Sequence, residues 1–385
     1  MVDRRELAER LSEGRPLRVK LGVDPTARDI TLGWAVPLRK LRHFQDAGHT
    51  AVLIVGDFTA RIGDPSGKSE TRPQLTKEQV RANADAVLDQ FMDILASDHL
   101  EVRYNSEWLE PMHLSDVLRL TSHYTVARLL ERDDFAKRYG AQKPISVIEF
   151  IYPLAQGYDS VAVEADVELG GTDQLFNLLL GRDIQRAYGQ RPQVALTMPL
   201  LVGTDGVQKM SQSLGNYVAI RDAAADMFGK LMSVPDTLMA QYALLAAGMD
   251  AREVGDVEAA ASAGGPRAAE AKRSIARAIV ALYHGDTAAA SAQEAFDRQF
   301  KQHEPPAEIV DGHIPADAVD GDRIYLPRVL AELGLASSRG EARRLIAQGG
   351  VKINGEKTTL EEFVLDDLEG AVVQVGRRRF IRLIT

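Results

Sequence analysis

Three polar residues are spaced so that a helix would carry them on one face. Tyr152, Gln156 and Asp159 stand at i, i+4 and i+7, and apolar residues such as Val147 and Ile148 precede them. The apolar flanks predict a buried helix, and a buried face with three polar groups is costly unless those groups are paired. A pocket for a small polar ligand would satisfy them, and so would an internal hydrogen-bond network.

Two loops place acidic residues beside glycines. Asp64 lies in Ile62–Lys68 (IGDPSGK), which has good turn chemistry but would also let the carboxylate hold a cation such as a ligand ammonium. In Glu168–Gln174 (ELGGTDQ), paired glycines would let a ligand meet the backbone, and Asp173 would bridge ribose hydroxyls. The alternative for the second loop is a plain turn in which Asp173 caps the next helix.

Two other loops suit phosphates. Asp24–Trp34 (DPTARDITLGW) leads into an expected helix, whose N-terminus offers unpaired N–H groups to an anion, and Gly33 would allow close approach of a nucleotide. Lys209–Asn216 (KMSQSLGN) is a glycine-flanked basic loop that suits a mobile clamp on phosphates. The alternatives are a tight turn at Gly33 and a solvated surface lysine at Lys209.

Strands alternating with helices must position these loops. Apolar or periodic runs predict strands at 17–23, 50–56 and 194–202 and helices at 34–46 and 76–95. This alternation implies an α/β fold with a Rossmann-like, doubly wound parallel sheet. Ligands in such folds bind at the carboxyl ends of the strands, near the topological switch, so the loops after Val23, after Gly56 and around Gly170 should form the site.

Composition changes along the chain predict four segments. Residues 1–221 would form the catalytic α/β domain, and the alanine-rich stretch 222–302, with helical periodicity over Ala271–Tyr283, would form a helical domain. Residues 303–322 carry prolines and acids without a clear period, which indicates a linker. Residues 323–385 have 11 Arg and Lys against 8 Asp and Glu, whereas the whole chain carries −9, so this last segment is locally basic.

The remaining composition excludes several classes. The chain has 385 residues, 45% hydrophobic and 26% charged, which is ordinary globular composition. It has no cysteine, hence no disulfide or thiolate metal site, and it lacks an HExxH motif, so no protein-held metal is predicted. We expect no signal peptide and no transmembrane helix, and a cytoplasmic protein.

Taken together and in their order along the chain, these motifs resemble those of bacterial tyrosyl-tRNA synthetases, which are class I aminoacyl-tRNA synthetases. The resemblance covers essentially the whole chain. The spacing of Tyr152, Gln156 and Asp159 and the segment Gly170–Gln174 resemble the family's tyrosine and ribose sites. Lys209–Ser213 resembles its KMSKS loop, and Thr31–Trp34 stands where the class has its HIGH motif.

The resemblance implies a role for each matching position. Asp64, Tyr152 and Gln156 would hold the ammonium of L-tyrosine, Asp159 would accept the hydrogen bond of its phenolic hydroxyl, and Gln174 would lie near the reacting carboxylate.

For the nucleotide, the resemblance implies that Gly171 and Asp173 hold the ribose, while the first loop, the HIGH segment and the KMSKS loop hold the phosphates. The residues expected to bind ATP or act on its phosphates are Asp24, Thr26, Thr31, Gly33, Trp34, Gly171, Asp173, Lys209, Ser211 and Gln212. The attacking carboxylate is already a nucleophile, so the site must supply positioning and charge stabilisation rather than a general acid or base. Mg²⁺ would accompany ATP.

Residues 323–385, with the stretches Ser337–Arg343 and Gly349–Gly355, resemble the small α+β RNA-binding domain named after ribosomal protein S four. The resemblance therefore implies tRNA(Tyr) as a partner and a homodimeric enzyme. The residues expected to contact tRNA are Arg339, Arg343, Arg344 and Lys352.

Four positions depart from the family pattern. Thr31 and Trp34 replace the two histidines of HIGH, Gln212 replaces the second lysine of KMSKS, and Lys20 stands where some members have a second phenol-binding tyrosine. One preorganised donor stabilises a transition state by ~2–4 kcal/mol, so these changes bear on the rate more than on the reaction type. Trp34 would either pack as helix core or place its ring near the adenine.

The sequence thus predicts a ligase that activates tyrosine with ATP and transfers it to tRNA. Two alternatives stay open. One is a paralogue that makes tyrosyl adenylate for a non-translational pathway, which the altered HIGH and KMSKS segments would suit. The other is a non-catalytic RNA-binding protein on the same scaffold.

Overall fold

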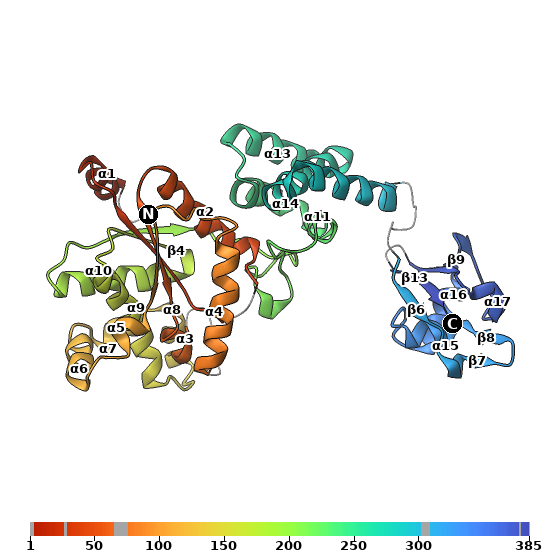
Figure 1. Cartoon of the computed structure of the whole chain (residues 1–385), viewed down its shortest axis with the longest axis horizontal. Coiled ribbons are helices and arrows are strands. Elements are labelled where there is room, and N and C mark those ends of the chain that lie inside the picture. The colour runs from red at the N-terminus through yellow and green to blue at the C-terminus, as the bar shows by residue number, and fades with distance from the viewer. Residues whose placement is uncertain (1–3, 27–28, 65–75, 302–308, 377–378, 385) are drawn as a thin grey trace. The chain divides into compact units, whose positions relative to one another are not determined.

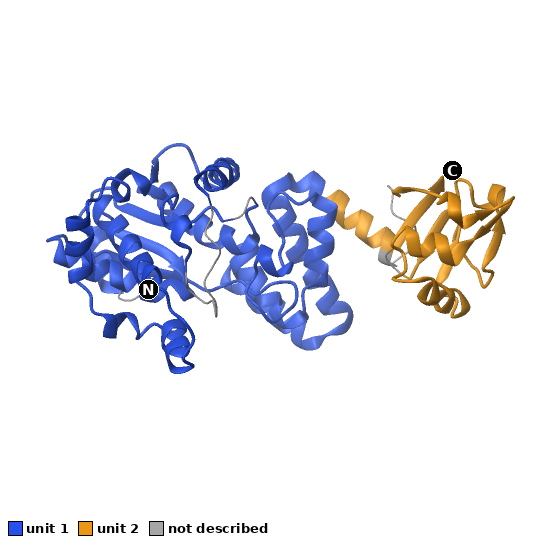
Figure 2. Ribbon diagram, turned by 90° about the horizontal axis from the view of Figure 1, so that it is seen from below, with its two compact units in different colours: residues 1–289 blue, residues 290–385 orange. Residues whose placement is uncertain are grey.

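The chain forms two compact units, residues 1–289 and 290–385 (Figure 2). The computed structural model describes residues 4–26, 29–64, 76–301, 309–376 and 379–384. The positions Pro65–Lys68 of the second predicted loop, residues 303–308 of the predicted linker and the basic residues Arg377 and Arg378 lie outside these ranges.

A five-stranded parallel sheet forms the centre of the first unit, with helices on both faces (Figure 1). Its order is β3-β2-β1-β4-β5. The strands are β1 (Arg18–Val23), β2 (Thr50–Val55), β3 (Leu100–Tyr104), β4 (Val167–Gly171) and β5 (Val194–Met198). The predicted fold class is confirmed, and so are the strands predicted at 17–23 and 50–56 to within one residue, whereas the strand predicted over 194–202 ends at Met198. Because β1 lies between β2 and β4, the direction of winding changes at β1, and the site is expected at the carboxyl ends of β1 and β4.

Burial on both faces explains the continuous apolar runs of the central strands. In β2 the residues from Ala51 to Val55 are at most 3% exposed. Around the sheet lie the helices α1 (Arg4–Ser12), α2 (Leu32–Asp46), α3 (Thr59–Ile62), α4 (Lys77–Phe91), α5 (Ser106–Leu109), α6 (Leu114–Ser122), α7 (Val126–Leu129), α8 (Asp133–Gly140), α9 (Val147–Ala162) and α10 (Leu175–Ala187).

Side-chain caps define where the two predicted helices begin. Thr31 caps α2, so this helix starts two residues before the predicted Trp34. Thr76 and Gln79 form a capping box at the start of α4, and this helix ends at Phe91, four residues before the predicted end. The sequence therefore identified both helices, with boundary errors of a few residues.

The predicted helix around Tyr152 is α9, but its first turn is not buried. Val147 is 76% exposed and Ile148 is 37% exposed, whereas Leu154 is 2% exposed. The expectation that all the apolar flanks are buried is therefore wrong. The helix packs against α10, and its buried side runs from Glu149 to Ser160, while Val147 and Ile148 lie on the exposed side of its first turn.

Helices follow the sheet, as predicted for this stretch. They are α11 (Ala224–Ser233), α12 (Met239–Gln241), the π-helix η4 (Tyr242–Ala247), α13 (Ala251–Ala263) and α14 (Gly265–Lys301). The last of them, the 37-residue α14, ends beyond residue 289, where the first unit stops. Gly285 has φ 81° and breaks α14 into two helices. A left-handed backbone at this point is accessible to glycine without strain.

The second unit has its own core. It contains two small sheets, ordered β10-β9-β12-β13-β6 and β11-β8-β7, with helices α15 (Leu326–Glu332), α16 (Arg339–Ala347) and α17 (Leu365–Leu368). The strands are β6 (Asp311–His313), β7 (Val319–Asp320), β8 (Arg323–Tyr325), β9 (Val351–Ile353), β10 (Glu356–Lys357), β11 (Glu362–Val364), β12 (Val372–Val375) and β13 (Arg379–Ile384).

The predicted linker over 303–322 is wrong for its described part. Asp311–His313 is a strand paired in parallel with β13, and Ile314 belongs to the core of the second unit. A Cβ on Gly312 would lie 2.3 Å from Ile381 Cδ1, so glycine is what lets this strand lie so close to its neighbour. Three residues are too few to show a strand period, which is why the prolines and acids around them suggested a linker.

Candidate active site

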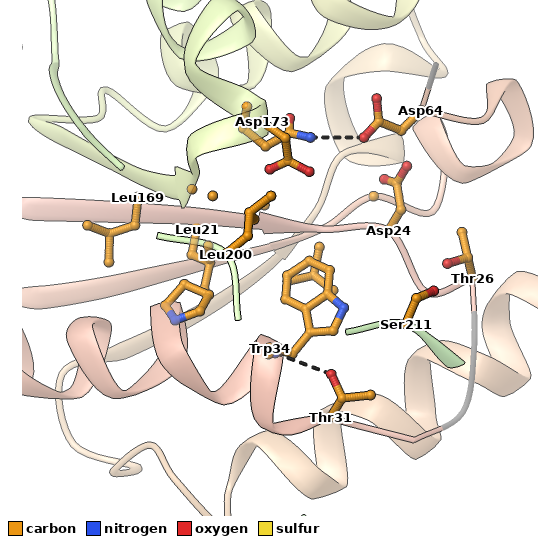
Figure 3. A pocket seen from close by; sticks show the side chains of 18 of the residues that line it. Leu21, Asp24, Thr26, Thr31, Trp34, Asp64, Leu169, Asp173, Leu200 and Ser211 are labelled. Carbon is orange, nitrogen blue, oxygen red and sulfur yellow. Dashed lines mark hydrogen bonds between the residues drawn. The ribbon is translucent and has the colours of Figure 1, made fainter. Parts of the chain in front are cut away.

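All the residues predicted to contact tyrosine or ATP line one cavity of about 570 Å³ at the carboxyl ends of β1 and β4. Figure 3 shows part of this lining. The lining includes Asp24, Thr26, Thr31, Gly33, Trp34, Asp64, Tyr152, Gln156, Asp159, Gly171, Asp173, Gln174, Lys209, Ser211 and Gln212. Segments far apart in the chain therefore meet at the topological switch point, which is where a ligand site is expected in this fold.

Asp159 is a buried hydrogen-bond acceptor in this cavity. It is 3% exposed, and its carboxylate accepts from Trp108 Nε1 at 2.8 Å and from Asn105 Nδ2 at 3.3 Å. Burial raises the pKa of Asp159 to about 6, against the opposing effects of nearby Lys20 and of these two donors. Near neutral pH the group is mainly a carboxylate, which suits it to a ligand hydroxyl.

Asp24 was predicted to bind ATP, but its carboxylate is bonded to Tyr152, one of the residues predicted to bind the amino acid tyrosine. Its carboxylate accepts from Tyr152 Oη at 2.8 Å and from Thr59 Oγ1 at 2.8 Å. Withdrawal from solvent raises the pKa of Asp24 to about 7, opposed by Thr59 and Tyr152 and reinforced by the charges of Asp64 and Asp159. A cation placed here would neutralise a strongly acidic pocket.

In the half of the cavity that contains Asp24 and Asp159, side-chain amides connect the polar groups. Gln174 Nε2 donates to Asp64 Oδ2 at 3.0 Å. Asn177 Nδ2 donates to Gln156 Oε1 and to Gln174 Oε1, both at 3.0 Å. Protein partners therefore hold these side chains in place.

The opposite half of the cavity is more open. Trp34 is 38% exposed, so the helix-core alternative for this residue is wrong, and Figure 3 shows its ring pointing into the cavity on the side of Ser211. Thr31 Oγ1 accepts from the Trp34 N–H at 3.4 Å, which leaves the threonine hydroxyl hydrogen free for another acceptor. A Cβ on Gly33 would make only ordinary contacts, the nearest at 3.5 Å, so packing within the protein does not itself require glycine at this position of the cavity wall.

The KMSKS-like loop reaches this open half. Lys209 Nζ forms an ion pair with Asp173 Oδ2 at 2.8 Å, although half of the lysine side chain is exposed. The Gln212 side-chain amide donates to the carbonyl of Asp29. The loop is held from behind by Asn216, whose Oδ1 accepts from Ser211 N at 2.8 Å.

Gly171 is required by its surroundings. A Cβ there would lie 2.5 Å from Asp173 Oδ1 and 2.7 Å from Leu200 Cδ2. Both contacts are shorter than a Cβ tolerates, so a larger residue here would force the side chains of Asp173 and Leu200 to move.

Several residues of the site were missed by sequence reasoning. Asn105 and Trp108, which hold Asp159, follow β3, and Thr59 and Asn177 come from helices α3 and α10. Asn105 directly follows a strand, a position that would have marked it had β3 been predicted. Trp108 carries no comparable signal.

The residues expected to contact tRNA lie in the second unit. Arg339, Arg343 and Arg344 are exposed on α16, and Lys352 is half-buried on β9. Arg343 pairs with Glu361 at 3.0 Å, so part of its charge is already balanced.

Within the described residues, no group of three or more histidine, aspartate or glutamate side chains is placed to hold a metal ion. No described helix is long and apolar enough to cross a membrane.

Comparison with known proteins agrees with this geometry. The profile of a family described as tRNA synthetases class I (W and Y) matches residues 12–301, and that of the S4 domain matches residues 326–372. The tyrosine–tRNA ligase of Moorella thermoacetica is 50% identical, over 99% of this chain and 91% of its own. That of Carboxydothermus hydrogenoformans is 49% identical, over 100% and 95%.

A solved structure shares the fold at lower identity. The tyrosyl-tRNA synthetase from Archaeoglobus fulgidus, complexed with L-tyrosine, is 24% identical and superposes with a TM-score of 0.60, covering 75% of this chain and 94% of its own.

Proposed function

The chain belongs to the class I tRNA synthetases for tryptophan and tyrosine, and we infer from this premise that it is the tyrosine-specific enzyme of translation. It activates L-tyrosine with ATP to tyrosyl adenylate and transfers the tyrosyl group to tRNA(Tyr). The observation that carries the choice of amino acid is Asp159: a buried carboxylate that suits a phenolic hydroxyl. A pocket built for a hydroxyl discriminates strongly against an analogue that lacks it.

The tyrosine ammonium would bind between Asp64, Gln156 and Asp24. The amide network supports this position, because Gln174 and Asn177 already hold Asp64 and Gln156 in place. Gln174 then lies beside the substrate carboxylate. A carboxylate oxygen attacks the α-phosphorus of ATP, a P–O bond forms, and the bond to pyrophosphate breaks.

The open half would bind ATP. We assign the ribose to Gly171 and Asp173 and the phosphates to Thr26, Thr31 and the loop from Lys209 to Gln212. The Lys209–Asp173 ion pair supports a coupled motion. When ribose hydroxyls occupy Asp173, the lysine is released to the departing pyrophosphate, whose negative charge it stabilises. In the second step a terminal ribose hydroxyl of tRNA attacks the adenylate carbonyl, and AMP leaves.

We propose that Mg²⁺ enters with ATP. The cavity wall facing the phosphates offers hydroxyls, an amide and Lys209 rather than clustered carboxylates. Mg²⁺ commonly keeps several waters and binds substrate phosphates, which fits a wall of this kind. A translation enzyme of this type would act in the cytoplasm.

We propose that the enzyme is a homodimer through an apolar face on helices α6 to α10. Those helices pack together around a core that includes Leu120, Leu154 and Ile184. Their outer sides carry large apolar residues that are at least 37% exposed: Leu114, Leu118, Val126, Tyr139, Val147, Ile148, Leu175 and Leu179. This many exposed apolar residues is typical of an interface rather than of a free surface. Light scattering should give the mass of a dimer, and Val147→Glu should shift it towards a monomer.

One experiment tests the function directly. The purified chain should exchange labelled pyrophosphate into ATP only when tyrosine is present, and should then charge tRNA(Tyr). Exchange without charging would favour the non-translational paralogue. Absence of exchange would favour the non-catalytic scaffold.

A truncation tests the role assigned to the second unit. A chain ending at residue 301 removes all its strands, including β6, and should keep pyrophosphate exchange while charging tRNA more weakly. The tRNA affinity of the full chain should also fall more steeply with salt, because Arg and Lys contacts to phosphate release counterions. If tRNA affinity falls equally steeply with salt in the full chain and in the truncation, the tRNA contacts are made elsewhere. The residues then excluded as contacts are Arg339, Arg343, Arg344 and Lys352.

A further inference from the structure

A buried ion pair lies behind the tyrosine pocket. Lys20, in the middle of β1, is 0% exposed, and its neighbour in the sheet is Glu168 on β4, which is 1% exposed. Lys20 Nζ lies 3.0 Å from Glu168 Oε1. Lysine and glutamate are almost never fully buried unless paired. Removing both charges from water costs about as much as their attraction returns, so stability alone is a weak reason for such a pair.

The pair is bonded mainly to one helix. Lys20 Nζ donates to the Gln156 carbonyl at 2.9 Å and to Ser160 Oγ at 2.7 Å. Glu168 accepts from Gln156 Nε2 and from Ser160 Oγ, both at 3.3 Å, and also from the side-chain amide of Gln193. Gln156 and Ser160 are one turn apart on α9, so the ion pair holds this turn against the sheet.

The same turn of α9 carries Asp159, and the groups that donate to Asp159, Trp108 and Asn105, are both neutral. Burial raises the pKa of Asp159 most, and the Lys20 ammonium opposes it more than any other group, while Glu168 adds to the rise. The other titratable neighbours are Asp24, at the end of β1, and Tyr152, on α9 itself.

We propose that Lys20 and Glu168 are positioning residues that set tyrosine specificity, Lys20 by keeping Asp159 a carboxylate and Glu168 by fixing the amide of Gln156. This inference rests on the proposed function. An ionised Asp159 accepts the phenolic hydrogen bond strongly, and a protonated one does so weakly, whereas phenylalanine is indifferent to its state. Gln156 Nε2 is engaged with Glu168, and Gln156 Oε1, which accepts from Asn177, has a second lone pair for the ligand ammonium.

The positive charge of Lys20 should lower the pKa of Asp159 and the negative charge of Glu168 should raise it. A pair that only supports the structure would not produce opposite shifts when each charge is removed. The test follows tyrosine-dependent pyrophosphate exchange by the full chain and measures kcat/KM for tyrosine and for phenylalanine from pH 5 to 8.5. The wild-type ratio of kcat/KM for tyrosine to kcat/KM for phenylalanine should fall as the pH drops through about 6, when Asp159 takes up a proton. Protonation of Asp24, whose pKa is about 7, affects the ammonium of both amino acids alike and cancels in this ratio.

The fall at low pH is the acid limb of the profile. Lys20→Met should move this acid limb to higher pH by ~1 unit or more, the usual scale for loss of a nearby opposite charge. At pH 7 a pKa moved from about 6 to about 7 leaves about half of Asp159 ionised instead of about nine-tenths, so the preference for tyrosine over phenylalanine should fall about 2-fold there and about 10-fold at pH 5. Glu168→Gln should move the limb to lower pH. The double variant, which removes both charges together, should lie between the two.

The double variant keeps the test decisive if Lys20→Met alone fails to fold, because its acid limb must still lie above that of Glu168→Gln. Glu101→Gln is the matched control. It removes the acidic partner of Arg18, also on β1, at a half-exposed ion pair away from the cavity, and it should leave the profile unchanged.

Acid limbs that shift in the same direction in all variants, or that do not shift, would overturn the proposal and leave the pair a structural support. A wild-type chain without tyrosine-dependent exchange would instead overturn the proposed function, whatever the variants do.

Discussion

The two halves of the cavity differ in how their polar groups are satisfied. In the tyrosine half, protein donors hold Asp24 and Asp159, and Asp159 is 3% exposed. In the nucleotide half, Trp34 is 38% exposed and Lys209 makes a solvent-accessible ion pair. Three of the four departures from the family pattern, Thr31, Trp34 and Gln212, line this half, although Thr31 itself is only 3% exposed.

The difference has a physical cause. A buried polar group without a partner costs about 1–3 kcal/mol, so each residue of the tyrosine half must match both the ligand and its protein neighbours. An exposed donor to a phosphate can be replaced by another donor or by water at lower cost. The open half can therefore change residues while the reaction stays the same.

The largest effect should come from breaking the closed half. Asp159→Ala removes the acceptor for the phenol and leaves Trp108 and Asn105 with unpaired buried donors. Discrimination against phenylalanine should fall, by up to ~10⁴–10⁵, because tyrosine loses its matched partner while phenylalanine loses nothing. Competing pyrophosphate-exchange rates for the two amino acids measure this. Asp46→Ala, which removes a carboxylate paired with Arg42 outside the cavity, is the control. Equal losses on both amino acids would mean that Asp159 does not bind the hydroxyl.

Lys209→Ala should be the largest change in the open half. The rate of adenylate formation should fall by ~10²–10³, the scale for one charged transition-state donor, while tyrosine affinity stays nearly constant. Rapid-quench measurement of adenylate and equilibrium binding of tyrosine separate the two quantities. Lys137→Ala, an exposed lysine paired with Asp133, is the matched control. If Lys209→Ala weakens tyrosine binding as much as it slows adenylation, then the half of the cavity proposed to bind ATP also affects tyrosine binding in the other half.

Changes in the HIGH-like segment should be smaller. Thr31→Ala should slow adenylation by a factor of about 2–13, corresponding to the ~0.5–1.5 kcal/mol of one neutral hydrogen bond. Trp34→His should accelerate it if this position still faces ATP, as its exposure indicates. Thermal unfolding of both variants checks the capping contribution of Thr31. If the adenylation rate is unchanged in both variants, the ATP phosphates do not bind at the start of α2.

The smallest effect should be a proton released when tyrosine binds. The pKa of Asp24 is raised to about 7 by withdrawal from solvent. Below that pH the free enzyme holds a proton there, and an arriving ammonium favours the carboxylate and lowers this pKa. Less than one proton should therefore be released at pH 6.5, and less as the pH rises above 7. Calorimetry in buffers of different ionisation enthalpy measures this, and proton uptake instead of release would place the ammonium elsewhere.

Residues within one element were predictable from the sequence. Tyr152, Gln156 and Asp159 share a face because the helix period is local. The central strands β1 and β2 were visible as apolar runs because they are mostly buried, whereas β3, which is only partly buried, was missed. The loops were placed together correctly because parallel strands end at the same edge of a sheet.

Residues that meet across the fold were not predictable in this way. Lys20 contacts Gln156 over 136 residues and Tyr152 contacts Asp24 over 128, and no local period encodes the strand register and helix packing that set these pairs. For the same reason residues 309–322 suggested a linker, and Val147 was expected inside. The sequence by itself determined the chemistry of each loop and the type of sheet that carries them. Only the tertiary structure decided which carboxylates lose their water and which partners replace it, because burial belongs to the packed molecule and not to any single segment.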